Sequence, residues 1–345
     1  MNRVLLALFV LFAVQFQTKA AVWQHDTSLE WDETWQERYS QWVETSVKAG
    51  FFKKMGSPFA DVKMDCADAY YALQAYFARE HKLPFSVEHG KVTNLMTRFD
   101  GFSNPDVRLA KFMNYLRGHY GTEALVHKDT FPPALKEVAP GDIFMWKIGK
   151  AGNFTRHTYI IQSINDDGTF DVIYSTQANA AKNGPLKVKK GYMFKKRPKH
   201  RGGDRNRWGF RRMKPAQYAD WDQESVPGAN FEQYDLAEKL STTDFFFHIR
   251  KLFQTVSQTP QQMVQKAFTS LCSALQGRIE IVNNAQEELK ATGGACMNFA
   301  KYDAHSTPSR DSGLMQDYTN FEYILEQLES AGEIDEVSEP LLSNS

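Results

Sequence analysis

The spacing of apolar residues switches between helical and strand-like periods, and these switches outline the expected elements. A helix is predicted to begin at Cys66, because Asp65 is a good N-cap residue and apolar side chains then recur at helical spacing. These side chains are Ala67, Tyr70, Leu73, Ala75 and Phe77. Leu83-Pro84 ends the run, so the helix is expected to stop before it.

Three strand-like segments follow after a long interval. The turn residues 139–142, Ala-Pro-Gly-Asp, precede an apolar run at 143–146, and a second strand is predicted from His157 to Gln162. The sequence 165–168, Asn-Asp-Asp-Gly, has the composition of a hairpin turn, and the third strand is predicted over 170–177. The middle strand therefore has a histidine at its first position.

The last third of the chain has a helical pattern. Thr259-Pro260 is an N-cap and first-turn pair, and one face of the following helix is apolar, with Val264, Phe268, Leu271, Leu275 and Val282. A further helix is expected to end near Gly332 and to bury Tyr318, Phe321, Ile324, Leu325 and Leu328. We predict a helical accessory domain over 230–332, followed by an acidic, disordered tail over 333–345.

The N-terminal segment has two parts. Residues 1–20 combine Arg3, an apolar run at 4–14 and a small-residue cleavage site ending at Ala20, which is typical of a signal peptide. The apolar run is too short for a membrane span, so we expect a periplasmic or secreted protein with no membrane anchor. Residues 21–49 hold the aromatic stripe Trp31, Trp35, Tyr39 and Trp42. This stripe predicts an amphipathic helix packed on the core, or alternatively a platform for sugar rings.

The charge balance and the cysteine content limit which partners, cofactors and reactive groups we expect. The 345 residues include 41 Lys and Arg against 41 Asp and Glu, so nothing points to nucleic acid as a partner. No cofactor is indicated, and the spacing of His119 and His127 matches no metal site. Of the three cysteines, Cys272 and Cys296 could pair in an oxidising compartment, which would leave Cys66 as the odd thiol.

Cys66 and His157 are the candidate reactive pair. A thiol in the first helical position faces unpaired backbone N–H groups and the positive end of the helix dipole, and both favour the nucleophilic thiolate. A histidine at a strand end could supply the base that such a nucleophile needs. The alternatives are a small buried cysteine and a solvated histidine at a strand end.

The order of these motifs resembles the NlpC-type and CHAP-type papain-like hydrolases. In those families Asp-Cys opens a helix, Pro-Gly-Asp precedes a strand and His opens the next strand, and the resemblance covers roughly residues 50–215. It implies an α+β papain-like fold, with the Cys-bearing helix packed on a small antiparallel sheet. Ala67-Asp68 departs from the usual Ser-Gly, and the long span from Cys66 to His157 requires an insertion at about 85–135.

The resemblance also implies the site and the substrate. Cys66 would attack a peptide or amide carbonyl, most simply in peptidoglycan, with His157 as the base. A third polar residue would orient His157 from the next strand. Ser175 is preferred for its position near the strand end, while Gln177 and Asp171 share its face and stay open.

A basic segment at 182–214 lies within the expected catalytic domain, which spans 50–220. We expect it to attract peptidoglycan or another anionic cell-wall polymer, or alternatively to be a solvated strand edge. Its cations are Lys187, Lys189, Lys190, Lys195, Lys196, Arg197, Lys199, Arg201, Arg205, Arg207, Arg211 and Arg212. The sequence thus predicts an exported cysteine hydrolase. Two alternatives are a cysteine peptidase or acyltransferase acting on proteins, and a non-catalytic wall-binding module on the same fold.

Overall fold

The computed structural model describes residues 21–150, 153–176, 186–194, 196–200, 207–294, 296, 298, 305 and 307–332. The predicted signal peptide at 1–20, the tail at 333–345 and the candidate Gln177 lie outside these residues.

A six-stranded antiparallel sheet forms the centre of the protein, in the strand order β3-β10-β4-β5-β6-β7. Its strands are β3 (Thr130–Phe131), β4 (Ile143–Lys150), β5 (Asn153–Ile164), β6 (Phe170–Tyr174), β7 (Lys187–Tyr192) and β10 (Phe210–Met213). Two small hairpins accompany it, β1 (Ser86–Val87) with β2 (Val92–Thr93) and β8 (Lys199–His200) with β9 (Arg207–Trp208). The predicted hairpin turn at 165–168 does join β5 to β6.

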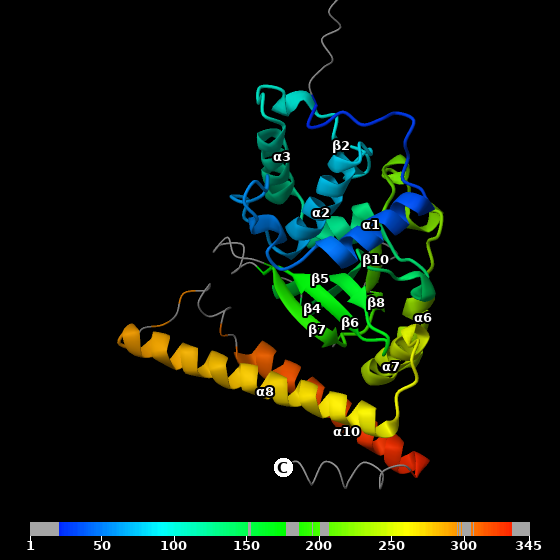
Figure 1. Ribbon diagram of the computed structural model, residues 1–345, viewed down its shortest axis with the longest axis vertical. Coiled ribbons are helices and arrows are strands. Elements are labelled where there is room, and N and C mark those ends of the chain that lie inside the picture. Colours follow the sequence, from blue (N-terminus) through cyan, green and yellow to red (C-terminus); the bar gives the residue numbers. More distant parts are fainter. Residues whose placement is uncertain are drawn as a thin grey trace, which may run out of the picture.

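Helices cover both faces of this sheet (Figure 1). One face carries α1 (Glu33–Ser46), α2 (Cys66–Glu80), α3 (Pro105–His119) and α4 (Thr122–Ala124). The short helical turns are η1 (Phe51–Lys53), η2 (Thr97–Phe99), η3 (Leu125–Asp129), η4 (Leu135–Glu137), η5 (Ala216–Tyr218) and η6 (Gln223–Ser225). The expectation of a mixed helix-and-sheet fold around a small antiparallel sheet is therefore confirmed.

The predicted aromatic stripe of α1 is part of the core beside α2. The rings of Trp31, Trp35, Tyr39 and Trp42 lie 5.9, 6.4, 5.3 and 5.4 Å from the ring of Phe77 on α2. Gly141 makes this packing possible, since it has φ +89° and a Cβ there would lie 2.5 Å from a ring carbon of Tyr39. The stripe therefore packs inward and does not form an exposed platform for sugars.

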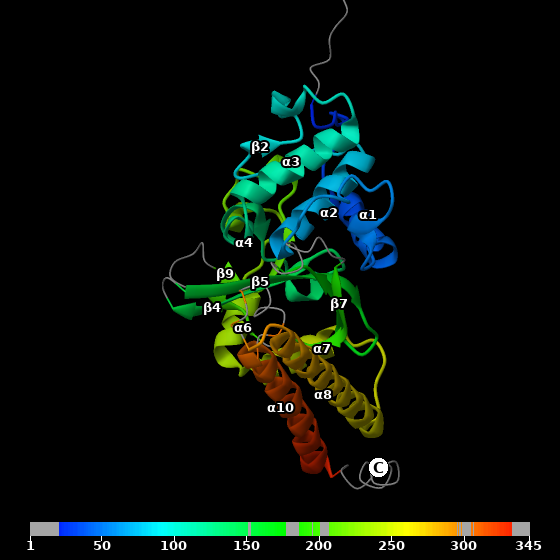
Figure 2. The ribbon, with the colours of Figure 1, turned by 90° about the vertical axis from the view of Figure 1, so that its left-hand side faces the viewer.

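The opposite face of the sheet carries a second, phenylalanine-rich core, covered by α6 (Glu232–Lys239) and α7 (Thr242–Phe253) (Figure 2). Phe144, Phe194 and Phe246 pack together there with ring centroids 4.2 to 5.9 Å apart, and the rings of Phe144 and Phe194 are stacked. Because α6 and α7 complete the core of the sheet, the separate helical unit begins at α8 and not at residue 230.

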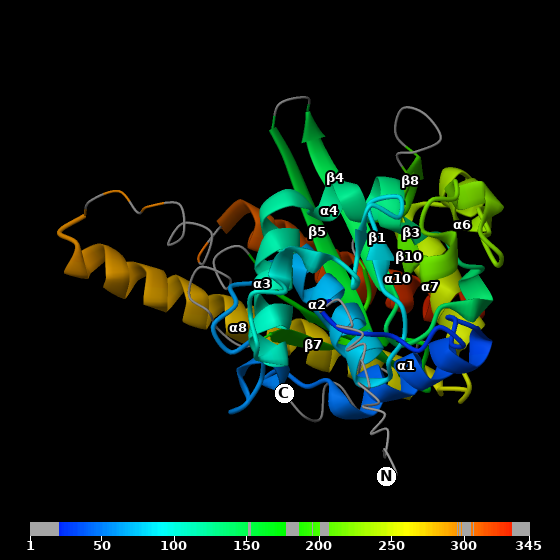
Figure 3. The same ribbon diagram turned by 90° about the horizontal axis from the view of Figure 1, so that it is seen from above.

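The C-terminal unit is a hairpin of two long helices, α8 (Pro260–Ala291) and α10 (Thr307–Ala331), beside the sheet (Figure 3). The helices run antiparallel, because the Phe268 ring lies 6.0 Å from that of Phe321 and Arg278 pairs with Asp311 at 2.7 Å. Val264 is fully buried, but Phe268 and Leu275 on the same predicted face keep 41% and 42% of their surface exposed. A two-helix unit covers only part of an apolar face this wide.

The expected Cys272–Cys296 disulfide is not formed. Both thiols are free and exposed. Cys272 lies 19 residues before the end of α8, about 28 Å along a continuous helix, and the five residues from there to Cys296 span at most about 18 Å. The two thiols therefore cannot meet while α8 stays intact.

Much of the basic segment stabilises the fold. Arg212 binds both carboxylate oxygens of Asp142 at 2.8 Å, so it anchors the Pro-Gly-Asp turn to β10. Arg211 is fully buried and donates to oxygens of Val126, Thr130, Arg207, Gln223 and Tyr234. These two arginines therefore do not belong to a basic surface that could attract an anionic polymer, while Lys195, Arg201 and Arg205 lie outside the described residues.

We expect Arg211→Met to lower the free energy of unfolding by about 3 kcal/mol or more, since several buried acceptors would lose their donor. Urea denaturation measures this loss. Arg38→Met, which removes an exposed arginine from α1, is the control and should change stability little. Equal stability of the two variants would contradict the structural role of Arg211.

Candidate functional site

Cys66 is the first residue of α2, as predicted. The Asp65 carboxylate accepts hydrogen bonds from the backbone N–H groups of Ala67 (3.0 Å) and Asp68 (3.2 Å). The Asp68 side chain accepts from the N–H of Asp65 at 2.9 Å, which completes a capping box. The thiol is buried, with 7% of the residue exposed, and its sulfur lies 4.0 Å from Oγ1 of Thr122 on α4.

Burial decides the protonation of this thiol. It raises the pKa of Cys66 to about 12, and the nearby Asp65 carboxylate raises it further, while groups of Thr158 and Thr122 oppose the rise. The helix N-terminus does not compensate for the loss of hydration. Cys66 is therefore a neutral thiol at physiological pH and not the thiolate that its helix position suggested.

The structure does not bring His157 to Cys66. Successive residues of a strand point to opposite faces, and Ile160 packs in the core beneath α2 whereas Tyr159 and Ile161 pack in the phenylalanine-rich core. His157 lies on the side of Tyr159, with ring centroids 4.6 Å apart. The predicted nucleophile and base are thus separated by the sheet, and Thr158 faces the thiol instead.

His157 belongs to an aromatic and cationic cluster on the α7 side of the sheet. Its ring lies 5.2 Å from Tyr174 and 5.9 Å from Trp146. The Lys189 ammonium is 4.4 Å from the Tyr192 ring centroid and 5.5 Å from that of Tyr159. Burial, then Lys189 and Lys187, lower the pKa of His157 to about 3, so the imidazole is neutral.

The candidates for a third catalytic residue have structural contacts. Ser175 is buried and donates to the Met64 carbonyl at 2.6 Å, so it holds the turn that precedes Cys66. Asp171 accepts from the Asn165 amide at 3.0 Å and from the Gly191 N–H at 2.9 Å, which ties the β5–β6 turn to β7.

Sequence reasoning missed Thr122 and Thr158 as the polar neighbours of Cys66. The run from Thr158 to Ile161 is buried on both faces of the sheet, so it shows no alternation of apolar and polar residues. The sequence therefore did not show which of these residues face α2 and which face α7. Thr122 lies in the predicted insertion and carries no motif.

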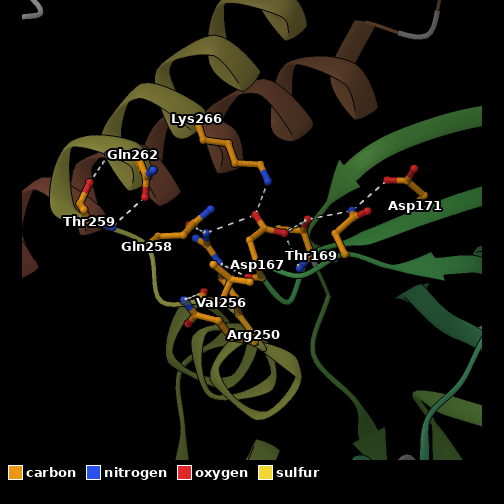
Figure 4. Close-up of polar contacts among 11 residues, drawn as sticks. Asp167, Thr169, Asp171, Arg250, Val256, Gln258, Thr259, Gln262 and Lys266 are labelled. Carbon is orange, nitrogen blue, oxygen red and sulfur yellow. Dashed lines mark hydrogen bonds and ion pairs between the residues drawn. The ribbon is translucent and has the colours of Figure 1, made fainter.

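A groove of about 1220 Å³ lies elsewhere, between α8 and the β5–β6 turn with neighbouring β7. Figure 4 shows its polar contacts. The lining residues are mostly of polar type, although their carbon atoms form the larger part of the accessible surface, and Cys66 is not among them. The residues that line the groove are Asn165, Asp166, Asp167, Asp171, Lys190, Gly191, Val256, Gln258, Gln261, Gln262, Gln265, Lys266, Thr269, Ser270 and Ser273.

Asp167 connects the two sides of this groove. Its carboxylate is 2.5 Å from Nζ of Lys266 on α8 and 3.4 Å from the Arg250 guanidinium on α7, and it accepts from the Thr169 hydroxyl at 2.6 Å. Burial raises the pKa of Asp167, but the contacts with Lys266 and Thr169 outweigh burial and leave this pKa below its usual value. The carboxylate is therefore charged at neutral pH and holds α8 against the sheet.

Other site classes find no support in the described part of the chain. No group of three or more His, Cys, Asp or Glu side chains there could hold a metal ion. Within the same residues, no helix has both the length and the apolar content to cross a membrane. Comparison of the chain with protein-family models, with curated proteins and with solved structures finds no match.

A neutral, buried Cys66 should react slowly with iodoacetamide in the native protein at pH 7, more slowly than the exposed Cys272 and Cys296. Mass spectrometry of the labelled peptides measures each rate, and labelling in urea gives the rate of the freed thiol. Faster labelling of Cys66 than of the two exposed cysteines would restore the thiolate assignment.

The His157 cluster should make stability depend on acid. The folded-state pKa of about 3 lies below the ordinary value of 6.5, so the unfolded chain takes up the proton first and stability falls as the pH drops below 6.5. His157→Gln should therefore lose less stability between pH 7 and pH 5 than the wild type does, as measured by urea denaturation.

Tyr174→Phe is the control for this experiment. It perturbs the same cluster and keeps the imidazole, so it should retain the wild-type dependence on pH. If His157→Gln loses as much stability on acidification as the wild type, the imidazole is not held neutral.

Proposed function

We propose that the chain is a non-catalytic binding module for a cell-wall polymer, built on a hydrolase-like arrangement of helix and sheet. This proposal rests on the identity of the side chains that face Cys66. The thiol meets the threonines Thr122 and Thr158, and His157 lies across the sheet.

The chemistry of these groups supports binding over turnover. A cysteine nucleophile needs a base that takes the thiol proton near neutral pH, and a threonine hydroxyl cannot take it. The pKa of Cys66, at about 12, leaves almost no thiolate at that pH. The hydrolase-like motifs of α2 and the Pro-Gly-Asp turn then serve the fold, through the capping box and the Asp142–Arg212 pair.

The sequence motifs support the cell wall as the location of the ligand. The predicted signal peptide would export the chain, and the resemblance to wall hydrolases concerns the same fold. The groove between α8 and the sheet offers the space for a polymer chain, since it is open and lined by hydrogen-bonding side chains.

An exported cysteine hydrolase is the second candidate, favoured by Asp65-Cys66 at the helix start. It requires a one-residue change in the register of β5, which would turn His157 toward the thiol. A cysteine peptidase or acyltransferase acting on proteins would need the same change.

Incubation with purified peptidoglycan sacculi separates these functions. The wild type and Cys66→Ala should both sediment with the sacculi, and neither should release soluble fragments, because no reactive thiol is involved. Sedimentation and chromatography of the supernatant measure the two outcomes. Release of fragments by the wild type that disappears in Cys66→Ala would establish the hydrolase instead.

A further inference from the structure

We infer that the groove between α8 and the β5–β6 turn binds a neutral chain rich in hydroxyl and amide groups, of the kind found in an N-acetylated glycan strand. This inference rests on the proposed function and specifies its ligand. It differs from the prediction of an anionic polymer, and the reasons lie in the groove lining.

One wall of the groove is a row of uncharged hydrogen-bonding side chains on α8. Gln261, Gln265, Thr269 and Ser273 follow one another at intervals of four residues, so they lie along one side of the helix over about 18 Å. Amides and hydroxyls can each donate and accept hydrogen bonds, although the Thr269 hydroxyl already donates to the Gln265 carbonyl at 2.8 Å and keeps only its acceptor sites. Sugar hydroxyls and acetamido groups also do both, so a glycan can pair with this row in several registers.

The charge of the groove argues against a polyanion. The lining contains three aspartates, Asp166, Asp167 and Asp171, against the two lysines Lys190 and Lys266. Lys266 is already paired with Asp167 across the groove, so its charge is neutralised within the fold and Lys190 is the second cation of the lining. An anionic polymer would meet as much repulsion as attraction here.

The lining also disfavours an apolar peptide. Val256 is the only large apolar side chain in this lining, so a bulky hydrophobic residue would meet mainly the carbon atoms of polar side chains. The carboxylates that remain accept hydrogen bonds from within the fold, as Asp171 does from Asn165 and Gly191. They are therefore positioned acceptors that a sugar hydroxyl can share.

Isothermal titration with N-acetylglucosamine oligomers tests this inference. We expect saturable binding whose affinity stays the same between about 0.05 and 0.5 M salt, because the oligomer carries no charge for the salt to screen. Gln261→Leu/Gln265→Leu should weaken binding about tenfold or more, since it removes at least two hydrogen bonds of about 1 kcal/mol each.

The matched control is Gln276→Leu/Gln286→Leu, which makes the same exchange at exposed positions of α8 outside the groove. It should bind the oligomer like the wild type. An equal loss in both double variants would show a general effect on α8 and would overturn the inference. The inference would also be overturned if the wild type did not bind the oligomer, or if an extended peptide bound the groove and the oligomer did not.

Sedimentation with sacculi keeps the two proposals apart. If the wild type and Gln261→Leu/Gln265→Leu sediment equally, the chain binds the wall through another surface, and only the groove assignment falls. If the wild type does not sediment at all, the proposed function falls, whatever the oligomer does. Loss of sedimentation in the groove variant alone supports both.

Discussion

The alternation of side chains along β5 is the constraint on which both faces of the molecule depend. Ile160 turns toward α2 and Tyr159 toward α7, so each of the two cores receives every second residue of one strand. A shift of one position would bury His157 beneath α2 and remove Tyr159 from its aromatic neighbours. The position of the imidazole is therefore decided by the packing of a whole strand and not by the histidine itself.

The same packing decides whether the Cys66 thiol is protonated. The capping box explains why α2 begins at Cys66, and the helix N-terminus favours ionisation of a thiol there, but the Asp65 carboxylate of the box opposes it. Close packing against Thr122 and Thr158 removes the water that a thiolate would need. Desolvation is the larger effect, so a helix start alone does not identify a nucleophile.

Local signals in the sequence predicted several elements, although β5 begins at Asn153, so His157 lies inside the strand and not at its first position as predicted. The start of α2, the turn between β5 and β6, the inward aromatic stripe of α1 and the Thr259 cap of α8 all follow from residues close together in the chain. The pairing of distant residues was not predictable in this way. Arg211 and Arg212 have the composition of a surface patch, and only the closing of β10 onto β4 makes them buried or half-buried anchors. The groove could not be predicted from local signals either, since its walls come from segments about a hundred residues apart.

The attachment of the α8–α10 hairpin has a consequence for how the protein fluctuates. The hairpin has a small core of its own around Val264, Ile324 and Leu328. It contacts the remainder through Lys266 on Asp167, through Tyr323, whose hydroxyl donates to Asp244 at 2.9 Å, and through Phe247 of α7, whose ring lies 4.5 Å from that of Tyr323. Because the hairpin has a core of its own, we expect it to open as a cooperative unit at a lower free energy than the sheet does. A molecule held between the two walls of the groove is released whenever this unit opens, and its binding energy in turn resists the opening.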